Sequence, residues 1–223
     1  MLGRRHDRRR LDRLATARAT SYRCLVLRLD LDAIRARLLS STAAPPAEAK
    51  GSRAAVAVLL RRASNEDGTE ILFIRRAEDP RDPWSGHMAF PGGRQDPEDG
   101  DDLLTTAVRE TREELGLELL EHGEPIGQLP DLPAIARGKA ISMIIRPYVV
   151  ALRGDPVLAP NHEVAEVLWA PLAPIVRGDH RTTREYVHEG RRLDLPAHRI
   201  GERIVWGLTF QMLESLTALL RKP

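Results

Sequence analysis

Three glutamates in one short segment are the residues of this chain whose types and spacing could do chemistry. Glu110, Glu113 and Glu114 stand at helical spacing, which gathers them on one side of a helix. Gly92 and Gly93 precede them, and such glycines let the backbone approach a ligand closely. Several carboxylate and carbonyl oxygens suit a hard divalent cation. The alternative interpretation is a solvated acidic face, because runs of charge usually face water.

The helix that must position these carboxylates has recognisable ends. Asp101 and Asp102 can cap its start, where acids suit the helix dipole, and Gly116 can close its end. Arg109 lies four residues before Glu113, a spacing that predicts an ion pair along the helix. We expect one mostly apolar face to pack on the core. Its members are Leu104, Ala107, Val108, Thr111 and Leu115.

These residues also carry a family resemblance. The segment matches the Nudix box at Arg109, Glu110, Glu113, Glu114 and Gly116. Similarity to that family implies an α/β fold, specifically an α/β/α sandwich with a mixed β-sheet. It further implies a pyrophosphohydrolase that uses Mg²⁺ or Mn²⁺, with the three glutamates and Gly93 as metal ligands. Arg109 would then brace a carboxylate through an ion pair.

Two features of the box leave roles open. The early acid of the pattern is Asp101 here, with Glu98 or Asp99 as alternatives, and the segment before it is two residues longer than usual. An extension of this kind occurs in the branch that resembles coenzyme A diphosphatases. The general base is one of the box glutamates or a remote acid, for which Glu163 and Glu166 are the candidates.

The segment upstream of the box bears on the substrate. Arg76, Arg81, Gly86 and the run Phe90-Pro91-Gly92-Gly93 resemble the extra signature of coenzyme A diphosphatases. Two departures are present: Ala77 replaces the expected serine, and the interval from Arg81 to Gly86 is one residue longer.

The roles of these residues follow from their chemistry and from the resemblance. Arg76 and Arg81 are suited to bind the 3′-phosphate or the diphosphate, because arginine forks match phosphate oxygens. Gly92 and Gly93 leave room for phosphates. Trp84 either stacks on adenine or covers the core. The run Trp206-Gly207-Leu208-Thr209 also resembles the branch, and we interpret it as packing.

The resulting functional prediction is hydrolysis of coenzyme A or acyl-coenzyme A to adenosine 3′,5′-bisphosphate and (acyl-)4′-phosphopantetheine. The alternative substrate is ADP-ribose or another nucleoside diphosphate derivative. A different class of function would be a non-catalytic Nudix-like ligand sensor or an RNA-binding module. All box glutamates are present, which argues against the sensor.

Composition and charge narrow the setting. Cys24 is the sole cysteine of the 223 residues, which predicts a reducing compartment and a cytoplasmic location. No apolar run approaches the ~20 residues that cross a bilayer, so we expect no membrane partner. Residues 1–53 hold 13 Lys and Arg against 5 Asp and Glu, whereas residues 54–223 hold 21 against 27. The basic segment lacks interleaved aromatics, so nucleic acid is not the expected partner. A homodimer is left open.

We divide the chain into residues 1–50, a basic arm with a short helix and a linker, and residues 51–223, the domain that resembles Nudix hydrolases. Patterns of apolar residues predict further elements along the chain. These are a helix at 25–39, strands at 54–60, 70–75, 141–152 and 163–172, a turn at 65–68, a hairpin at 185–193 and a helix at 204–221. Pro147 is expected to bend its strand.

Overall fold

The computed structural model describes residues 29–41, 51–63, 68–82, 84–136, 139–188 and 190–222. The basic arm, most of the linker, Glu189 and residues 65–67 of the predicted turn lie outside these residues. The helices are α2 (Leu31–Ser40), α3 (Leu103–Leu115), α4 (Leu119–His122), α5 (Leu172–Arg177), α6 (Gly207–Arg221) and the short 3₁₀ helix η1 (Pro97–Asp99). The strands are β1 (Ser52–Arg62), β2 (Thr69–Arg76), β3 (Met88–Ala89), β4 (Gly92–Arg94), β5 (Gly123–Gln128), β6 (Leu132–Ala136), β7 (Lys139–Leu152), β8 (Val164–Pro171), β9 (Arg181–His188), β10 (Arg191–Ile200) and β11 (Arg203–Trp206).

The main sheet is mixed and is built around β1. Its hydrogen-bonded order is β3-β2-β1-β7-β5, with β4 on β1, β6 on β7 and β8 on β2. β1 runs parallel to β7 and antiparallel to β2 and β4. The predicted strands at 54–60, 70–75, 141–152 and 163–172 are therefore confirmed as β1, β2, β7 and β8.

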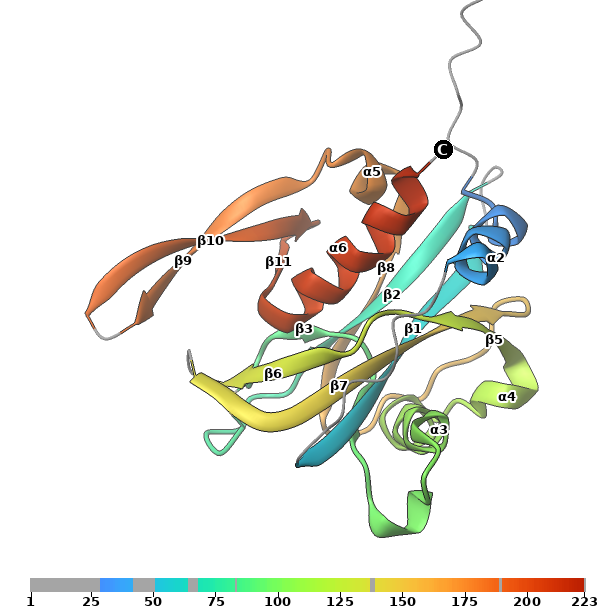
Figure 1. Ribbon diagram of the computed structural model, residues 1–223, viewed down its shortest axis with the longest axis horizontal. Helices are drawn as coiled ribbons and strands as arrows, with labels where there is room; N and C mark the ends of the chain where they lie inside the picture. The colour runs from blue at the N-terminus through green and yellow to red at the C-terminus, as the bar shows by residue number, and fades with distance from the viewer. Residues whose placement is uncertain are drawn as a thin grey trace, which may run out of the picture.

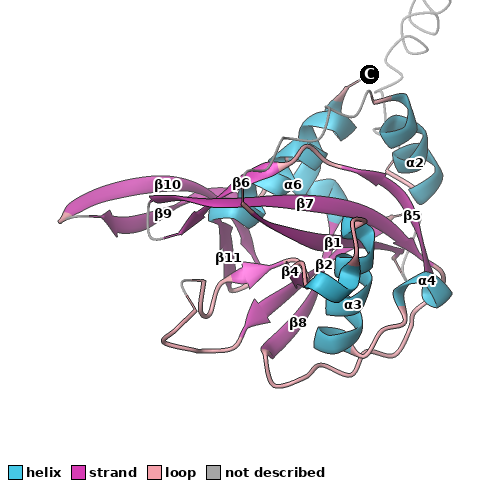
Figure 2. Cartoon of the chain, turned by 60° about the horizontal axis from the view of Figure 1, so that its bottom comes forward, coloured by secondary structure: helices cyan, strands magenta, loops and turns pink. Residues whose placement is uncertain are grey.

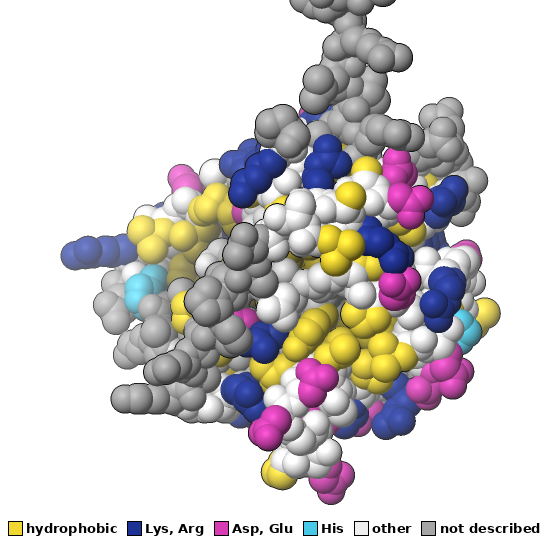
Figure 3. All heavy atoms as spheres, turned by 45° about the vertical axis from the view of Figure 1, so that its right-hand side comes forward, with side chains coloured by type: hydrophobic (Ala, Val, Ile, Leu, Met, Phe, Trp, Pro, Cys, Tyr) yellow, Lys and Arg dark blue, Asp and Glu magenta, His cyan; other side chains and the backbone are white. Residues whose placement is uncertain are grey.

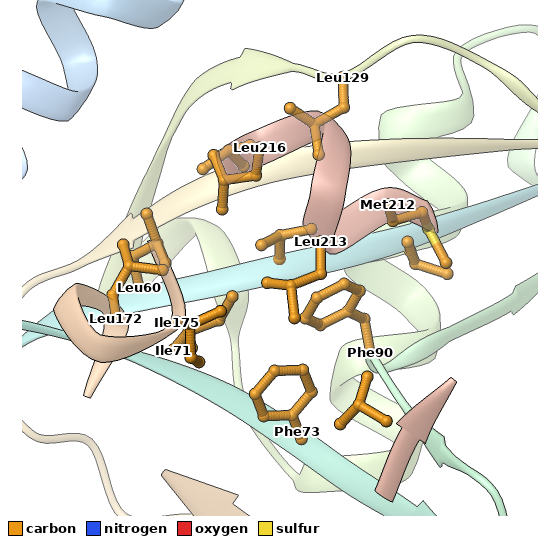
Figure 4. Close-up of a cluster of buried hydrophobic side chains, with 14 of the residues drawn as sticks. Leu60, Ile71, Phe73, Phe90, Leu129, Leu172, Ile175, Met212, Leu213 and Leu216 are labelled. Carbon is orange, nitrogen blue, oxygen red and sulfur yellow. The ribbon is translucent and has the colours of Figure 1, made fainter. Parts of the chain in front are cut away.

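Alternation along β1 creates two core layers, because successive side chains of a strand point to opposite faces. Val56, Val58 and Leu60 belong to a core that includes residues of α2, α5 and α6. Ala55, Ala57 and Leu59 belong to the other core, beneath α3. Figure 2 shows helices on both sides of the sheet, and Figure 4 shows the core under α6. The predicted α/β/α sandwich is confirmed.

The C-terminal part differs from the prediction. The hairpin at 185–193 is confirmed but is longer, comprising β9 and β10, and it projects beyond the main sheet (Figure 1). The predicted helix at 204–221 begins too early, because β11 occupies Arg203–Trp206 and pairs with β10. α6 starts only at Gly207, whose φ of +64° favours glycine.

The N-terminal helix packs on the domain. α2 covers Leu31–Ser40 and is capped by Asp30, whose side chain accepts a hydrogen bond from the Ala33 amide at 2.8 Å. Ile34 and Leu38 are buried in the core that α6 covers. The part of the predicted helix at 25–28 lies outside the described residues. The division of the chain at residue 50 stays a prediction.

Pro147 occupies the interior of β7 at the point where its pairing changes. β6 pairs up to Ile145 and β5 pairs from Tyr148. The Pro147 carbonyl accepts a hydrogen bond from Leu129 at 2.9 Å. A proline lacks the N–H that a continuous ladder would use, so its placement between two partner strands is favourable.

The surface in Figure 3 mixes both signs of charge around exposed apolar side chains. Among the described helices, none is both long and apolar enough to cross a bilayer.

Candidate active site

α3 positions the acidic cluster, and its ends are as predicted. The Asp102 side chain accepts a hydrogen bond from the Leu104 amide at 2.9 Å. Gly116 ends the helix in the left-handed conformation at φ +63°. The buried face is rotated from the predicted one, since Leu104 and Val108 are only partly buried. The fully buried members are Leu103, Thr106, Ala107, Thr111, Glu114 and Leu115.

Glu114 is the most constrained carboxylate of the cluster. It is 2% exposed, and its Oε2 accepts a hydrogen bond from the Gly92 amide at 2.8 Å. Its Oε1 lies 3.8 Å from a guanidinium nitrogen of Arg76. Burial raises the pKa of Glu114 to about 8, despite the opposing effects of the Gly92 amide and Arg76. The solvated-face interpretation therefore fails for Glu114.

Glu110 lies beside Glu114 and is half-buried. Burial raises its pKa, and Glu113 and Glu163 add to the rise by charge repulsion, whereas Arg109 opposes it. The carboxylate of Glu110 fills the space in which a Cβ at Gly93 would lie. Gly93 is therefore needed for close approach between β4 and α3.

This contact gives a testable prediction for Gly93→Ala. The new methyl group must displace the Glu110 carboxylate, and a misplacement of ~1 Å can cost about 10²-fold in rate. We expect kcat to fall by about that factor while thermal unfolding changes little, because the displaced atoms end a flexible side chain. Gly68→Ala is the matched control, since its added Cβ makes an ordinary 3.7 Å contact with Ala63. Unchanged kcat in Gly93→Ala would contradict the role of this contact.

Arg109 connects the helix to the loop in front of it. Its guanidinium binds Asp99 through Nε at 2.8 Å and Nη2 at 3.0 Å, and Nη1 lies 3.0 Å from both Glu110 and Glu113. The predicted pair with Glu113 is thus present but is one part of a larger network. Nη2 also donates to the Arg94 carbonyl at 2.9 Å. Arg109 therefore holds the Glu110 carboxylate in place.

The early acid that reaches this network is Asp99. It is 6% exposed and accepts a further hydrogen bond from the Thr106 hydroxyl at 2.8 Å. The Arg109 guanidinium holds the pKa of Asp99 well below its usual range. Glu98 and Asp101 are exposed to solvent. Of the three alternatives, Asp99 is the one whose side chain contacts α3, through Arg109 and Thr106.

A cavity of about 620 Å³ adjoins the acidic cluster. It is lined by the predicted substrate residues, which are Arg76, Arg81, Trp84, Gly92 and Gly93. Glu110 and Glu114 line it as well, but Glu113 does not and has a 48% exposed side chain. Of the two remote acids, Glu163 lines the cavity, whereas Glu166 pairs with Arg203 at 2.6 Å and Arg75 at 3.8 Å.

The two predicted phosphate-binding arginines already have carboxylate partners. Arg76 donates to Asp82 at 2.7 Å. Arg81 is 91% exposed and forms a two-point pair with Asp79 at 3.1 and 3.0 Å. Trp84 lines the cavity and also packs against the core, so the predicted covering of the core is confirmed, whereas stacking on adenine stays a prediction.

Sequence reasoning missed part of the cavity wall. Trp206, Leu208 and Thr209 line the cavity, although we interpreted them as packing. Thr209 also donates to the Met88 carbonyl at 3.0 Å, which fixes the start of α6 against β3. His87, which no sequence pattern distinguished, lies 4.7 Å from the Trp206 ring. The resemblance of the run at 206–209 to the coenzyme A diphosphatase branch was the sequence signal that could have placed these residues at the cavity.

The donor set at the cavity fits a hard divalent cation. Burial raises the pKa of both Glu110 and Glu114, and the charge of Glu110 adds to the rise for Glu114. A bound cation would stabilise the ionised form of both carboxylates. Within the described part of the chain, no three acidic or histidine side chains converge as a preformed metal centre. Mg²⁺ commonly takes one or two carboxylates and completes its shell with water and substrate phosphates. Glu110 and Glu114 supply two such carboxylates and leave the other ligand positions to water and substrate phosphates.

Comparison with known families identifies the domain. Residues 51–189 match the model of the NUDIX domain. The chain belongs to the Nudix hydrolase family. Nudix hydrolases generally use divalent metal ions and act on small nucleotide derivatives. The match includes the acidic helix, β4 and the cavity residues that precede the box.

Curated relatives of this Nudix hydrolase include two coenzyme A diphosphatases. A peroxisomal enzyme of Caenorhabditis elegans is 32% identical over 163 residues, which cover 72% of this chain and 65% of that protein. A mitochondrial enzyme of Homo sapiens is 32% identical over 188 residues, which cover 84% of this chain and 77% of that protein. The matched region thus spans just under two thirds of the nematode protein.

A solved structure supports the fold. The MutT/nudix family protein from Enterococcus faecalis superposes with a TM-score of 0.51 at 20% identity, covering 81% of this chain and 66% of that one. At that identity the likeness concerns the α/β/α sandwich alone.

The relatives also correct the predicted cytoplasmic location. Their names place those two relatives in peroxisomes and in mitochondria, which contradicts the prediction of a cytoplasmic location from this sequence. A single cysteine argues for a reducing compartment, but several compartments meet that condition, so the residue count was too weak a basis for the prediction.

Proposed function

We propose that this Nudix hydrolase cleaves the diphosphate of coenzyme A or acyl-coenzyme A. The products would be adenosine 3′,5′-bisphosphate and (acyl-)4′-phosphopantetheine. The observation that carries the proposal is one cavity lined by both Glu110 and Glu114 and by the signature residues Arg76, Arg81 and Trp84. The diphosphatase names of the nematode and human relatives support it.

In this proposal the cavity residues divide the work. Glu110, Glu114 and the Gly93 carbonyl hold Mg²⁺ or Mn²⁺, and Glu113 joins them at the solvent side. A bound divalent cation neutralises phosphate oxygens and lowers the pKa of a coordinated water. Arg109 is a positioning residue, because it holds Glu110 without lining the cavity itself. The candidates for general base are the box glutamates and Glu163.

The apolar part of the cavity lining suits a substrate with an apolar portion. Met143 and Ile145 of β7 and Leu208 and Met212 of α6 line the cavity. Apolar surface of this kind can bury a pantetheine chain, an acyl group or the face of an adenine. A cavity that joins phosphate chemistry to an apolar wall supports a coenzyme A derivative over a simple nucleotide.

ADP-ribose or another nucleoside diphosphate derivative is the second candidate. It is favoured by the two departures from the signature, Ala77 in place of serine and the longer interval before Gly86. The Ala77 amide donates to the Glu163 carbonyl at 2.7 Å, so the departure lies beside the cavity and not in a remote loop.

A substrate comparison separates these candidates. We would measure kcat/KM by HPLC with Mg²⁺ or Mn²⁺ on coenzyme A, acetyl-coenzyme A, ADP-ribose, NADH and a diadenosine polyphosphate. We expect coenzyme A or its thioester to exceed ADP-ribose by at least about tenfold, the effect of one charge-assisted hydrogen bond. A preference for ADP-ribose would establish the second candidate. Inactivity on every compound would favour a ligand sensor.

A further inference from the structure

A second cavity adjoins the first across a shared wall. It has a volume of about 340 Å³, and His87, Met88 and Trp206 line both cavities. Strand β2 and the two C-terminal strands β9 and β11 each bring an arginine to the second cavity. These are Arg75 of β2, Arg184 of β9 and Arg203 of β11.

The three arginines differ in how far their charges are neutralised. Arg75 and Arg203 share Glu166, at 3.8 and 2.6 Å. Arg75 also lies 3.5 Å from Glu78, one of the two acids that line this cavity. Arg184 forms no ion pair with any carboxylate of the described residues. A guanidinium without a carboxylate partner can bind an anionic ligand.

Arg184 is nevertheless held in place. Its guanidinium carbon lies 4.8 Å from the centre of the Trp206 ring. Contact with the face of an aromatic ring orients the cation without removing its charge. Tyr186 supports the same ring from a distance of 5.4 Å, and His87 does so from 4.7 Å. Trp206 therefore fixes Arg184 at the wall between the cavities.

His87 is also affected by the charge of Arg184. Burial lowers the pKa of His87, and the positive charge of Arg184 lowers it further. Both effects favour the neutral imidazole, whose ring nitrogens offer hydrogen bonding at the shared wall. Among the described residues, the lining of the second cavity thus includes Arg184 without a carboxylate partner, the His87 imidazole, and the acids Glu78 and Glu202.

We propose that the second cavity is a phosphomonoester subsite, in which Arg184 binds a phosphate that the substrate carries on its ribose. The inference rests on the proposed function, because the diphosphate must lie at Glu110 and Glu114 in the first cavity. A second phosphate of the same substrate then needs a separate cation. Arg76 and Arg81 are already engaged by Asp82 and Asp79, whereas Arg184 has no carboxylate partner among the described residues. Arginine is suited to this role because its fork matches phosphate oxygens.

The test compares coenzyme A with 3′-dephospho-coenzyme A, which lacks only the ribose phosphate. In Arg184→Gln we expect kcat/KM for coenzyme A to fall by about tenfold or more, mainly because KM rises. The kcat/KM for 3′-dephospho-coenzyme A should stay unchanged. Arg192→Gln is the control, because Arg192 is 79% exposed on the same hairpin and lines neither cavity. It should change neither value.

Arg94→Gln provides a second comparison. Arg94 lines the first cavity and, like Arg184, has no carboxylate partner among the described residues. Its loss should affect both coenzymes alike. The proposal is overturned if Arg184→Gln slows both coenzymes equally, or if the selective loss follows Arg94→Gln instead.

Binding measurements keep this test independent of turnover. If the wild-type protein cleaves neither coenzyme, the proposed function fails, but the subsite can still be examined by calorimetry. Adenosine 3′,5′-bisphosphate should then bind more tightly than adenosine 5′-monophosphate to the wild type, and the difference should vanish in Arg184→Gln. Equal binding of the two nucleotides to the wild type would overturn the subsite.

Discussion

Glu114→Gln is expected to reduce kcat for coenzyme A by at least about 10²-fold. The substitution keeps the shape of the side chain but removes a negative charge that lines the cavity beside Glu110. Steady-state kinetics with Mg²⁺ or Mn²⁺ would measure the effect. Glu121→Gln is the matched control, since Glu121 is an exposed acid on α4. Activity within about threefold of the wild type would contradict the assignment of Glu114.

The same substitution should stabilise the metal-free protein at alkaline pH. The folded-state pKa of Glu114 is raised from 4.5 to about 8, so the folded protein binds this proton more tightly than the unfolded chain. That contribution to stability is fully present below pH ~4.5 and is lost as the pH rises through about 8. Thermal unfolding with a chelator should therefore show Tm falling over this range in the wild type, and falling less in Glu114→Gln. Parallel pH profiles would show that burial does not suppress ionisation of Glu114.

Arg109→Met is expected to destabilise the fold by about 3–5 kcal/mol, which is typical when one partner of a buried pair is removed. Asp99, whose side chain is 2% exposed, would lose both of its bonds to the guanidinium. Urea unfolding near pH 7 would measure the change. Arg112→Met is the control, because Arg112 is exposed on the same helix. A loss below about 1 kcal/mol would contradict a structural role for the pair.

A double substitution and a pH series test the cause of that loss. Arg109→Met combined with Asp99→Asn should cost less than the sum of the single changes, because no unpaired buried charge remains. The pKa of Asp99 is depressed in the folded protein, so its stabilising contribution is present above the unfolded value near 3.9 and is lost as the pH falls. The wild type and Arg109→Met should therefore converge in stability toward acid pH.

Local chemistry explains which parts of the site were predictable from sequence. The bounds of α3 followed from Asp102 and Gly116, because caps act through residues within one turn. The ion pair of Arg109 with Glu113 followed from helical spacing. The choice of Asp99 over Asp101 did not follow, because it depends on the turn that η1 makes before the helix.

Contacts between distant segments explain what sequence did not reveal. The burial of Glu114 depends on the amide of Gly92, 22 residues earlier in the chain. The second cavity brings Arg75 of β2 together with Arg184 and Trp206 of the C-terminal sheet. The predicted helix at 204–221 included most of β11, because the helical pattern of α6 continues into these residues. Their pairing with β10 outweighs that pattern. Such pairings are set by tertiary structure, so local patterns do not contain them.

Product analysis after metal removal tests the central claim most directly. Protein treated with a chelator would be incubated with coenzyme A, with and without added Mn²⁺ or Mg²⁺, and the products identified by mass. We predict adenosine 3′,5′-bisphosphate and 4′-phosphopantetheine in equal amounts only when the cation is added. Equal rates of hydrolysis with and without the cation would contradict the dependence on metal. If coenzyme A stays intact in the presence of the cation while another nucleoside diphosphate derivative is hydrolysed, the proposed substrate is wrong.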